Sequence, residues 1–97
     1  MDKIDKYKKS GDVVHREIAG ERILVPIRGN VADMQKLFVL EGVGEFIWDK
    51  LDGELSATEI AGFVAEKFDV DEVTAKKDVS LFVGELLKNE LVLRNGI

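Results

Sequence analysis

Apolar and polar residues follow two different periods in the two halves of the chain. In the first half, β-branched residues dominate two short runs, residues 13–18 and 22–27, separated by a three-residue segment that contains Gly20. Glycine readily supplies the positive φ angle of a tight turn, so this pattern predicts a β-hairpin. Pro26 cannot donate a backbone hydrogen bond and therefore belongs at an edge or at the end of a strand.

A third strand is predicted from a run of four apolar residues. Leu37, Phe38, Val39 and Leu40 follow a polar stretch, residues 28–33, that is typical of a loop. Because successive side chains of a strand point to opposite faces, a fully apolar run needs cover on both faces. We expect this strand to complete a three-stranded antiparallel sheet.

After residue 40 the apolar spacing changes to the helical period of 3.6. A short helix is expected first, ending at Asp52 and Gly53. The second helix has the clearest start signal, because Ser56 and Glu59 have the spacing of a capping box. The expected inner faces are Val43, Phe46, Ile47 and Leu51 in the first helix and Ile60, Phe63, Val64 and Phe68 in the second.

The third predicted helix begins at Asp71 or Glu72 and runs to about Lys88. Asn89 is expected to stop it in a left-handed conformation, and residues 91–93 follow as a short extended segment. Its expected core stripe consists of Ala75, Val79, Phe82, Val83 and Leu86.

Strands that precede helices indicate an α+β fold rather than the alternation of a parallel sheet. A small three-stranded antiparallel sheet followed by three helices is winged-helix-like. The length of 97 residues fits one domain. We assign residues 13–97 to that domain and residues 1–12, which are rich in lysine, to a flexible N-terminal tail.

Composition and charge narrow the classes of function. The formal net charge is −5, and the backbone of a nucleic acid attracts the opposite sign, so nucleic acid is a disfavoured partner. The chain contains no cysteine, which fits a reducing compartment and removes thiolate chemistry. No run of residues is apolar and long enough to span a bilayer. We therefore expect a cytoplasmic protein without a membrane partner.

Candidate catalytic groups are sparse. His15 is the single histidine, and it has no cysteine or second histidine with which to hold a metal ion. Gly42 and Gly44 open a helix after a strand, but their spacing matches neither nucleotide-binding fingerprint, so a tight turn is the better explanation. We expect no enzymatic activity, no metal and no cofactor, and interpret the chain as a binding module.

An unusual stripe lies beside the core face of the third helix. It consists of Val73, Ser80, Gly84 and Leu87, with Lys76 and Lys77 at its side. Glycine in the middle of a helix costs about 1 kcal/mol relative to alanine, so Gly84 calls for an explanation. One explanation is a shallow groove for another backbone; the simpler one is close packing of another segment of this chain.

The strand at residues 37–40 offers a second element of such a groove. If it lies at the rim of the sheet beside the third helix, its free N–H and C=O groups form a template for an extended peptide. The same edge could instead pair with a second copy of the chain and give a homodimer.

Several residues together resemble the PqqD-like proteins, a family of peptide-recognition domains. The resemblance extends over residues 13–93, and the spacing of Gly44, Trp48 and Gly53 is its most specific part. The chain departs from the family pattern at Glu41, over residues 28–36, and at Asn89 and Glu90. The matching positions are Leu40, Gly44, Ile47, Trp48, Leu51, Asp52, Gly53, Glu59, Ile60, Asp78, Val79, Phe82, Leu86, Leu91 and Val92.

The resemblance implies a winged-helix-like protein that performs no chemistry. Members of the family capture the leader segment of a ribosomally made precursor peptide and present it to a modifying enzyme, often a radical S-adenosylmethionine enzyme. The pathway stays open between pyrroloquinoline quinone and other modified peptides. In the family, the leader adds to the third strand against the third helix. Those elements correspond here to Leu37, Phe38, Val39 and Leu40 and to Lys76, Lys77, Ser80, Gly84 and Leu87.

Two other classes of function remain open at this point. Three helices and a hairpin also suit a DNA-binding winged-helix regulator, although Glu72, Asp78 and Glu85 accompany the two lysines on the third helix. The other class is an interaction domain that oligomerises through its edge strand.

Overall fold

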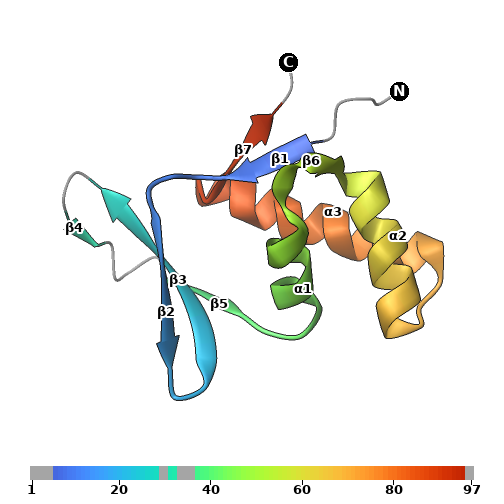
Figure 1. The fold of residues 1–97 in the computed structure, drawn as a ribbon, viewed down its shortest axis with the longest axis horizontal. Coiled ribbons are helices and arrows are strands. Elements are labelled where there is room, and N and C mark those ends of the chain that lie inside the picture. The colour runs from blue at the N-terminus through green and yellow to red at the C-terminus, as the bar shows by residue number, and fades with distance from the viewer. Residues whose placement is uncertain (1–5, 29–30, 33–36, 96–97) are drawn as a thin grey trace.

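The fold was analysed in a computed structural model, which describes residues 6–28, 31–32 and 37–95 (Figure 1). This part of the chain forms two small antiparallel sheets and three helices, an α+β arrangement as predicted. The strands are β1 (Lys6–Lys9), β2 (Val13–Ile18), β3 (Glu21–Arg28), β4 (Val31–Ala32), β5 (Phe38–Leu40), β6 (Asp52–Ser56) and β7 (Val92–Asn95). The helices are α1 (Val43–Lys50), α2 (Ala57–Phe68) and α3 (Glu72–Lys88).

The predicted hairpin is β2 and β3, joined by a two-residue turn. Ala19 and Gly20 both have positive φ, 54° and 85°, as the turn that suits a right-twisted hairpin requires. β5 pairs with β3 only as far as Leu24, and β4 begins to pair with β3 at Ile27. Pro26 lies between these two ladders. No described strand is paired with that side of β3 at Pro26, so its missing N–H costs no hydrogen bond there.

The second sheet joins the two ends of the chain. Its strand order is β6-β1-β7, so β1 is central, and Lys6 pairs with both Ser56 and Asn95. The prediction that residues 1–12 form a flexible tail missed this strand, because a single buried side chain, Tyr7, among lysines makes no readable pattern. Residues 1–5 of that tail lie outside the described residues.

The helix boundaries follow the local signals closely. Ser56 and Glu59 form the predicted capping box, and the Asp71 carboxylate accepts a 2.7 Å hydrogen bond from the Thr74 N–H at the start of α3. One detail of the prediction is wrong. Asn89 has an ordinary φ of −95°, and Glu90 has the left-handed conformation instead, with a φ of 62°.

One core joins the helices to both sheets. Trp48, Leu24 and Leu86 are fully buried and come from α1, β3 and α3. Phe63, which the helical pattern placed on the inner face of α2, is 40% exposed, and Ala61 is buried in its place. The other large buried side chains are Ile47, Leu51, Ile60, Val64, Val79, Leu91 and Val92.

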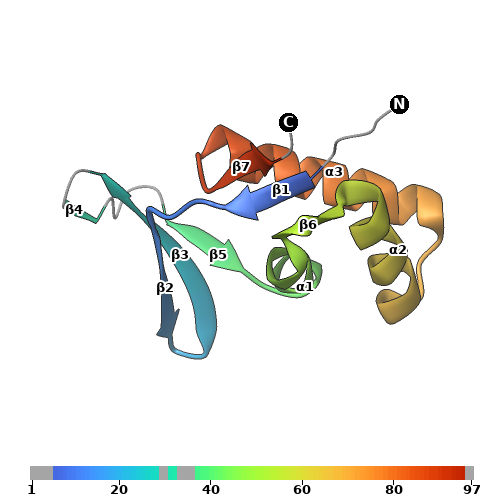
Figure 2. The same ribbon diagram turned by 45° about the horizontal axis from the view of Figure 1, so that its top comes forward.

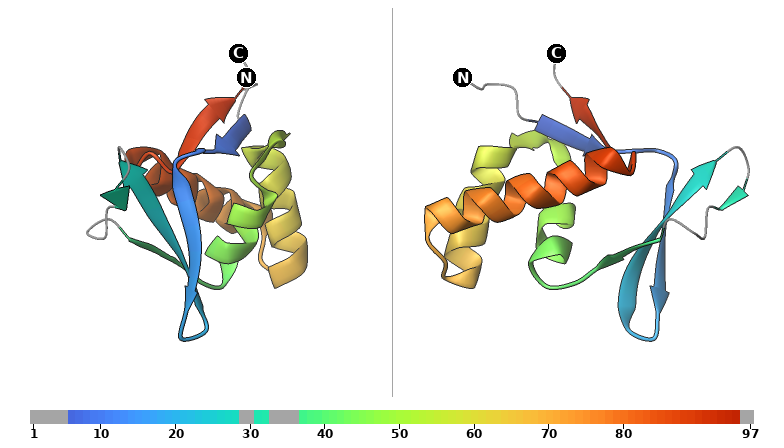
Figure 3. Two further views of the ribbon diagram at one scale, coloured as in Figure 1. Left: turned by 60° about the vertical axis from the view of Figure 1, so that its left-hand side comes forward. Right: turned by 180° about the vertical axis from the view of Figure 1, so that it is seen from behind.

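The other elements are arranged around α3. Figure 2 shows the β2–β3 hairpin projecting to one side and α2 at the opposite end of the molecule. Figure 3 shows α3 running between them, with the β6-β1-β7 sheet along one of its flanks and α1 and β5 along the other. No helix in the described ranges is long and apolar enough to cross a membrane.

Candidate functional site

β5 is an edge strand in the part of the chain that the structure describes. On one side it pairs with β3, through Leu24 with Phe38, Ile23 with Val39 and Arg22 with Leu40. No described strand pairs with its other side, and β5 passes below α3 toward α1 in the right-hand view of Figure 3. Val39 is 41% exposed, while Leu40 is buried.

An apolar groove lies beside this edge, between α1 and α3. Its volume is about 320 Å³, and Leu81 at its mouth is 63% exposed although it is a large apolar side chain. Phe82 joins the groove to the strand, since its ring lies 5.7 Å from that of Phe38 in an edge-on arrangement. The lining of this α1–α3 groove is Val43, Gly44, Ile47, Asp78, Leu81, Phe82 and Glu85.

Gly44 allows α1 to approach α3 closely at the groove. A β-carbon added at Gly44 would lie 2.9 Å from Cε1 of the Phe82 ring, closer than packed carbon atoms come. Gly42 does something different: it precedes α1 with a φ of 56°, a turn conformation that favours glycine. Glycine is therefore required at the two positions for different reasons: at Gly42 by the conformation of the turn, and at Gly44 by the close contact with Phe82.

The structure does not bring the predicted α3 stripe beside β5. Ser80, Gly84 and Leu87 line a different cavity, of about 260 Å³, together with Tyr7 of β1 and Arg94 of β7. Successive helical residues are turned by about 100°, so Gly84 points about 160° away from Phe82.

The two lysines of the predicted stripe also lie outside the α1–α3 groove. Lys76 lines a third cavity beside the start of α2, and Lys77 is exposed. The residues of β5, in contrast, do lie at an open edge beside α3. Gly84 is not explained by close packing, because a β-carbon there would meet nothing within 4 Å.

The α3 residues that line the α1–α3 groove were not among the predicted binding residues. Asp78, Leu81 and Glu85 lie next to Phe82 around the helix, and together the four form the groove side of α3. One signal was available: Leu81 is apolar but falls outside the core stripe, so it lacks a reason for being apolar. The signal was hidden because Asp78 and Glu85, one helical turn before and after Leu81, are charged and make this face look like an ordinary solvent-exposed one.

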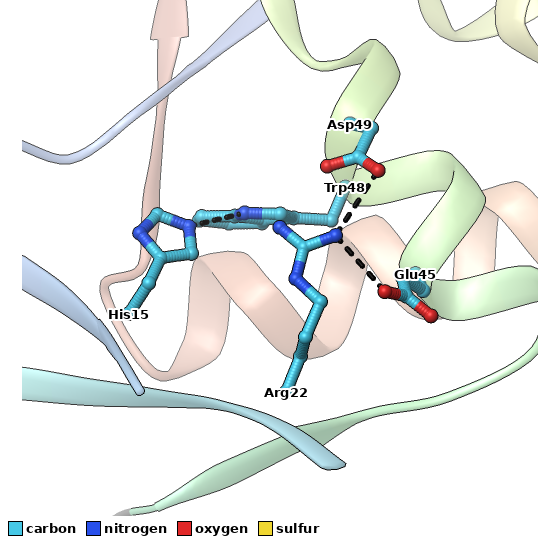
Figure 4. Close-up of polar contacts among 5 residues, drawn as sticks. All are labelled: His15, Arg22, Glu45, Trp48 and Asp49. Atoms are coloured by element: carbon cyan, nitrogen blue, oxygen red, sulfur yellow. Dashed lines mark hydrogen bonds and ion pairs between the residues drawn. The ribbon is translucent and has the colours of Figure 1, made fainter. Parts of the chain in front are cut away.

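His15 connects the hairpin to α1 (Figure 4). Its Nε2 accepts a 2.7 Å hydrogen bond from the indole N–H of Trp48, whose side chain is fully buried. A buried indole N–H needs an acceptor, so His15 must remain unprotonated at this nitrogen. His15 therefore has a structural role, because it holds the hairpin against α1.

Charged groups surround that hydrogen bond. The Nη1 atom of Arg22 lies 3.0 Å from Glu45 Oε2 and 3.1 Å from Asp49 Oδ2, which ties β3 to α1 (Figure 4). Burial, followed by the cations of Arg22 and Lys9, lowers the pKa of His15, and Asp49 acts in the opposite direction. Burial also lowers the pKa of Lys9, whose Nζ lies 5.3 Å from the centre of the Trp48 ring.

We refer to these contacts of His15 and Arg22 with α1 as the hairpin clamp. Because α1 carries Val43, Gly44 and Ile47, the clamp holds one wall of the groove. Within the described ranges, no group of three histidine, cysteine, aspartate or glutamate side chains is arranged to hold a metal ion.

An open strand edge beside an apolar groove, on an α+β fold of this kind, defines a module suited to taking up an extended peptide by strand addition. The chain belongs to the PqqD family. The family model, described as coenzyme PQQ synthesis protein D, matches residues 21–92, which contain β3, β5 and all three helices. No curated protein matches the chain.

Two solved structures have the same fold. TbiB1, solved in complex with the TbiA(beta) leader peptide, is 27% identical with a TM-score of 0.73, and the match covers 93% of this chain and 99% of TbiB1. A lasso peptide synthetase B1, complexed with the leader peptide, is 17% identical with a TM-score of 0.74, and 91% of this chain and 98% of that one are covered. The second of these similarities concerns the fold alone.

Proposed function

We propose that the protein binds the leader segment of a ribosomally synthesised precursor peptide and presents it to a modifying enzyme. The leader adds as a further strand to the free edge of β5, and its side chains enter the α1–α3 groove. The observation that carries this proposal is the open β5 edge next to an apolar groove in a chain of the PqqD family. TbiB1, whose structure contains a leader peptide, supports it.

The proposal assigns two tasks to two kinds of contact. Backbone hydrogen bonds along β5 supply affinity with little dependence on sequence, and the groove supplies register and selectivity. A short edge and one apolar groove are typical of binding in the nanomolar to micromolar range, about −8 to −12 kcal/mol.

The role that we propose is that of an adaptor without a reaction of its own. The modifying enzyme is then a separate partner, for example a radical S-adenosylmethionine enzyme of pyrroloquinoline quinone synthesis or of another modified-peptide pathway. Of the residues expected at the outset, those of β5 keep their proposed role. The groove side of α3 replaces the stripe of Lys76, Lys77, Ser80, Gly84 and Leu87.

The test is an amide chemical-shift titration of the ¹⁵N-labelled whole chain. The ligand is a synthetic peptide that spans the leader region of a short precursor encoded beside the gene, called the leader-region peptide below. We expect saturable shifts at Phe38, Val39 and Leu40 and at Leu81 and Phe82. Shifts confined to Ser80, Gly84 and Leu87 would instead place the peptide on the other flank of α3.

Two controls address the other classes of function. A duplex DNA of random sequence should cause no saturable shifts; shifts that weaken steeply with salt would favour the DNA-binding regulator. Light scattering over a range of protein concentrations should give a constant monomer mass. A mass that doubles, together with β5 shifts on dilution, would mean that the edge pairs with a second copy.

A further inference from the structure

We propose that the α1–α3 groove selects leader segments in which a bulky apolar residue is flanked by basic residues, and that Asp78 and Glu85 recognise those bases. This inference rests on the proposed function and adds a charge requirement to it. Strand addition to β5 alone imposes no such requirement, because backbone hydrogen bonds do not depend on the charge of the side chains.

Both charged residues that line the groove are acidic, and neither is paired with a described residue. Within residues 6–28, 31–32 and 37–95, neither Asp78 nor Glu85 forms an ion pair, and both are exposed. The acidic residues of α1 differ in this respect, since Glu45 and Asp49 both form ion pairs with Arg22. Two carboxylates on the rim of an apolar groove attract a cationic ligand group.

This acidic character distinguishes the groove from the other cavities along α3. The cavity on the opposite flank of α3 contains Arg94, and the cavity at the start of α2 contains Lys76. Among these three cavities along α3, the α1–α3 groove is therefore the one that presents only negative charge. A net charge of −5 alone would not produce this difference.

The spacing of the two carboxylates along α3 also suits an extended peptide. Asp78 and Glu85 are seven residues apart, which corresponds to about 10.5 Å along the helix axis. Figures 1 and 2 show β5 and α3 sloping in the same direction, so an added strand would run along the helix. An extended chain rises about 3.3 Å per residue and points alternate side chains to one face.

These dimensions lead to a simple pattern for the peptide. An apolar side chain at one position enters the groove beside Leu81 and Phe82, and basic residues two positions before and after it lie on the same face. Those two positions are about 13 Å apart, and the flexible side chains of lysine or arginine cover the small difference from the carboxylate spacing. The groove volume of about 320 Å³ accommodates one bulky anchor between them.

The experiment is a display selection with random twelve-residue peptides against the immobilised whole chain, followed by anisotropy measurements on synthetic copies of the enriched peptides. We expect lysine or arginine to be enriched two positions from an apolar anchor. Asp78→Asn and Glu85→Gln should each weaken binding of such a peptide by about two- to fivefold. Glu66→Gln, an exposed carboxylate on α2 that lines no described cavity near the groove, is the matched control and should have no effect.

A charge exchange gives the sharpest result. A peptide whose two basic residues are replaced by glutamate should bind the wild-type chain weakly and the Asp78→Lys/Glu85→Lys variant more tightly. Enriched peptides with an apolar anchor but no basic bias, or equal binding by the neutral variants, would overturn this inference and leave the proposed function intact. If no peptide is enriched, or the enriched ones shift residues away from β5, the proposed function itself fails.

Discussion

The two flanks of α3 differ in what they face and in how they are held. One flank carries Asp78, Leu81 and Glu85 and borders the α1–α3 groove, next to the open edge of β5. The other carries Ser80, Gly84 and Leu87 and lies under strands that already pair with each other, β1 and β7. An extended ligand can form backbone hydrogen bonds on the first flank, because β5 has an edge there with which none of the described strands pairs.

A stripe of small residues on a helix is therefore a weak indication of a binding site. Gly84 has open space around it and Gly44 has none, yet it is Gly44 that shapes the groove. A glycine is informative when its missing side chain lets two elements touch. Four predictions test whether the two flanks differ in function as they do in structure.

The largest effect is expected for Leu81→Asp. Leu81 is 63% exposed in the free protein, so the fold should survive, but a bound peptide would cover it. Losing the burial of one leucine side chain corresponds to about 1.5–3 kcal/mol, or roughly a 10- to 100-fold weaker affinity for the leader-region peptide. Isothermal calorimetry measures this change.

Val73→Asp is the matched control for that variant. Val73 is also an exposed apolar residue of α3, but it lines none of the cavities described above. It should leave the affinity unchanged. Equal losses in the two variants would mean that added negative charge, and not the groove, weakens binding.

A smaller effect is expected for Gly44→Ala. The new β-carbon displaces the Phe82 ring, which is a movable side chain, so the ring shifts into the groove while the backbone stays in place. We expect an affinity about fivefold weaker, equivalent to about 1 kcal/mol. Gly62→Ala in α2, where nothing lies within 4 Å, should leave binding unchanged and stabilise the fold by about 1 kcal/mol.

The third prediction concerns pH and the hairpin clamp. Because the pKa of His15 is lowered in the folded protein, the unfolded chain takes up this proton first as the pH falls. The contribution of His15 to the free energy of unfolding is therefore complete above its ordinary pKa of 6.5 and is lost progressively below it. Thermal unfolding at a series of pH values measures the loss.

His15→Gln isolates this contribution, since glutamine keeps an acceptor for the Trp48 N–H but does not titrate in this range. Between pH 7 and pH 5, the free energy of unfolding should fall less for the variant than for the wild type. Amide exchange should speed up in α1 on the groove flank before it does in β1 and β7, because the single histidine of the chain lies in the clamp. Identical pH profiles would show that protonation of His15 does not cause the loss of stability.

The smallest effect is expected for Gly84→Leu. A side chain at this position extends into the cavity that contains Tyr7 and Arg94, on the flank away from β5. The affinity for the leader-region peptide should change by less than about twofold, within the range of substitutions that touch no ligand. A large loss would restore the stripe of Ser80, Gly84 and Leu87 as the binding surface.

Local sequence signals predicted most of the elements. The capping box of Ser56 and Glu59, the cap at Asp71 and the hairpin turn at Gly20 each act within a few residues, so their physics is complete in a short window. β5 was readable for the same reason, although it begins at Phe38 and not at the predicted Leu37. β1 was not, because its stability comes from β6 and β7, about 45 and 85 residues away in the chain.

The sequence by itself determined that this chain forms three helices after a hairpin, has an apolar strand before the first of them, and resembles the PqqD family. Tertiary structure alone decided which flank of α3 meets that strand. The core stripe of Val79, Val83 and Leu86 is flanked on both sides by residues of mixed polarity, so periodicity cannot distinguish the two flanks. The pairing of β5 with β3 and the hydrogen bond from Trp48 to His15 fix how the sheet sits against α1, and thereby which flank becomes the groove.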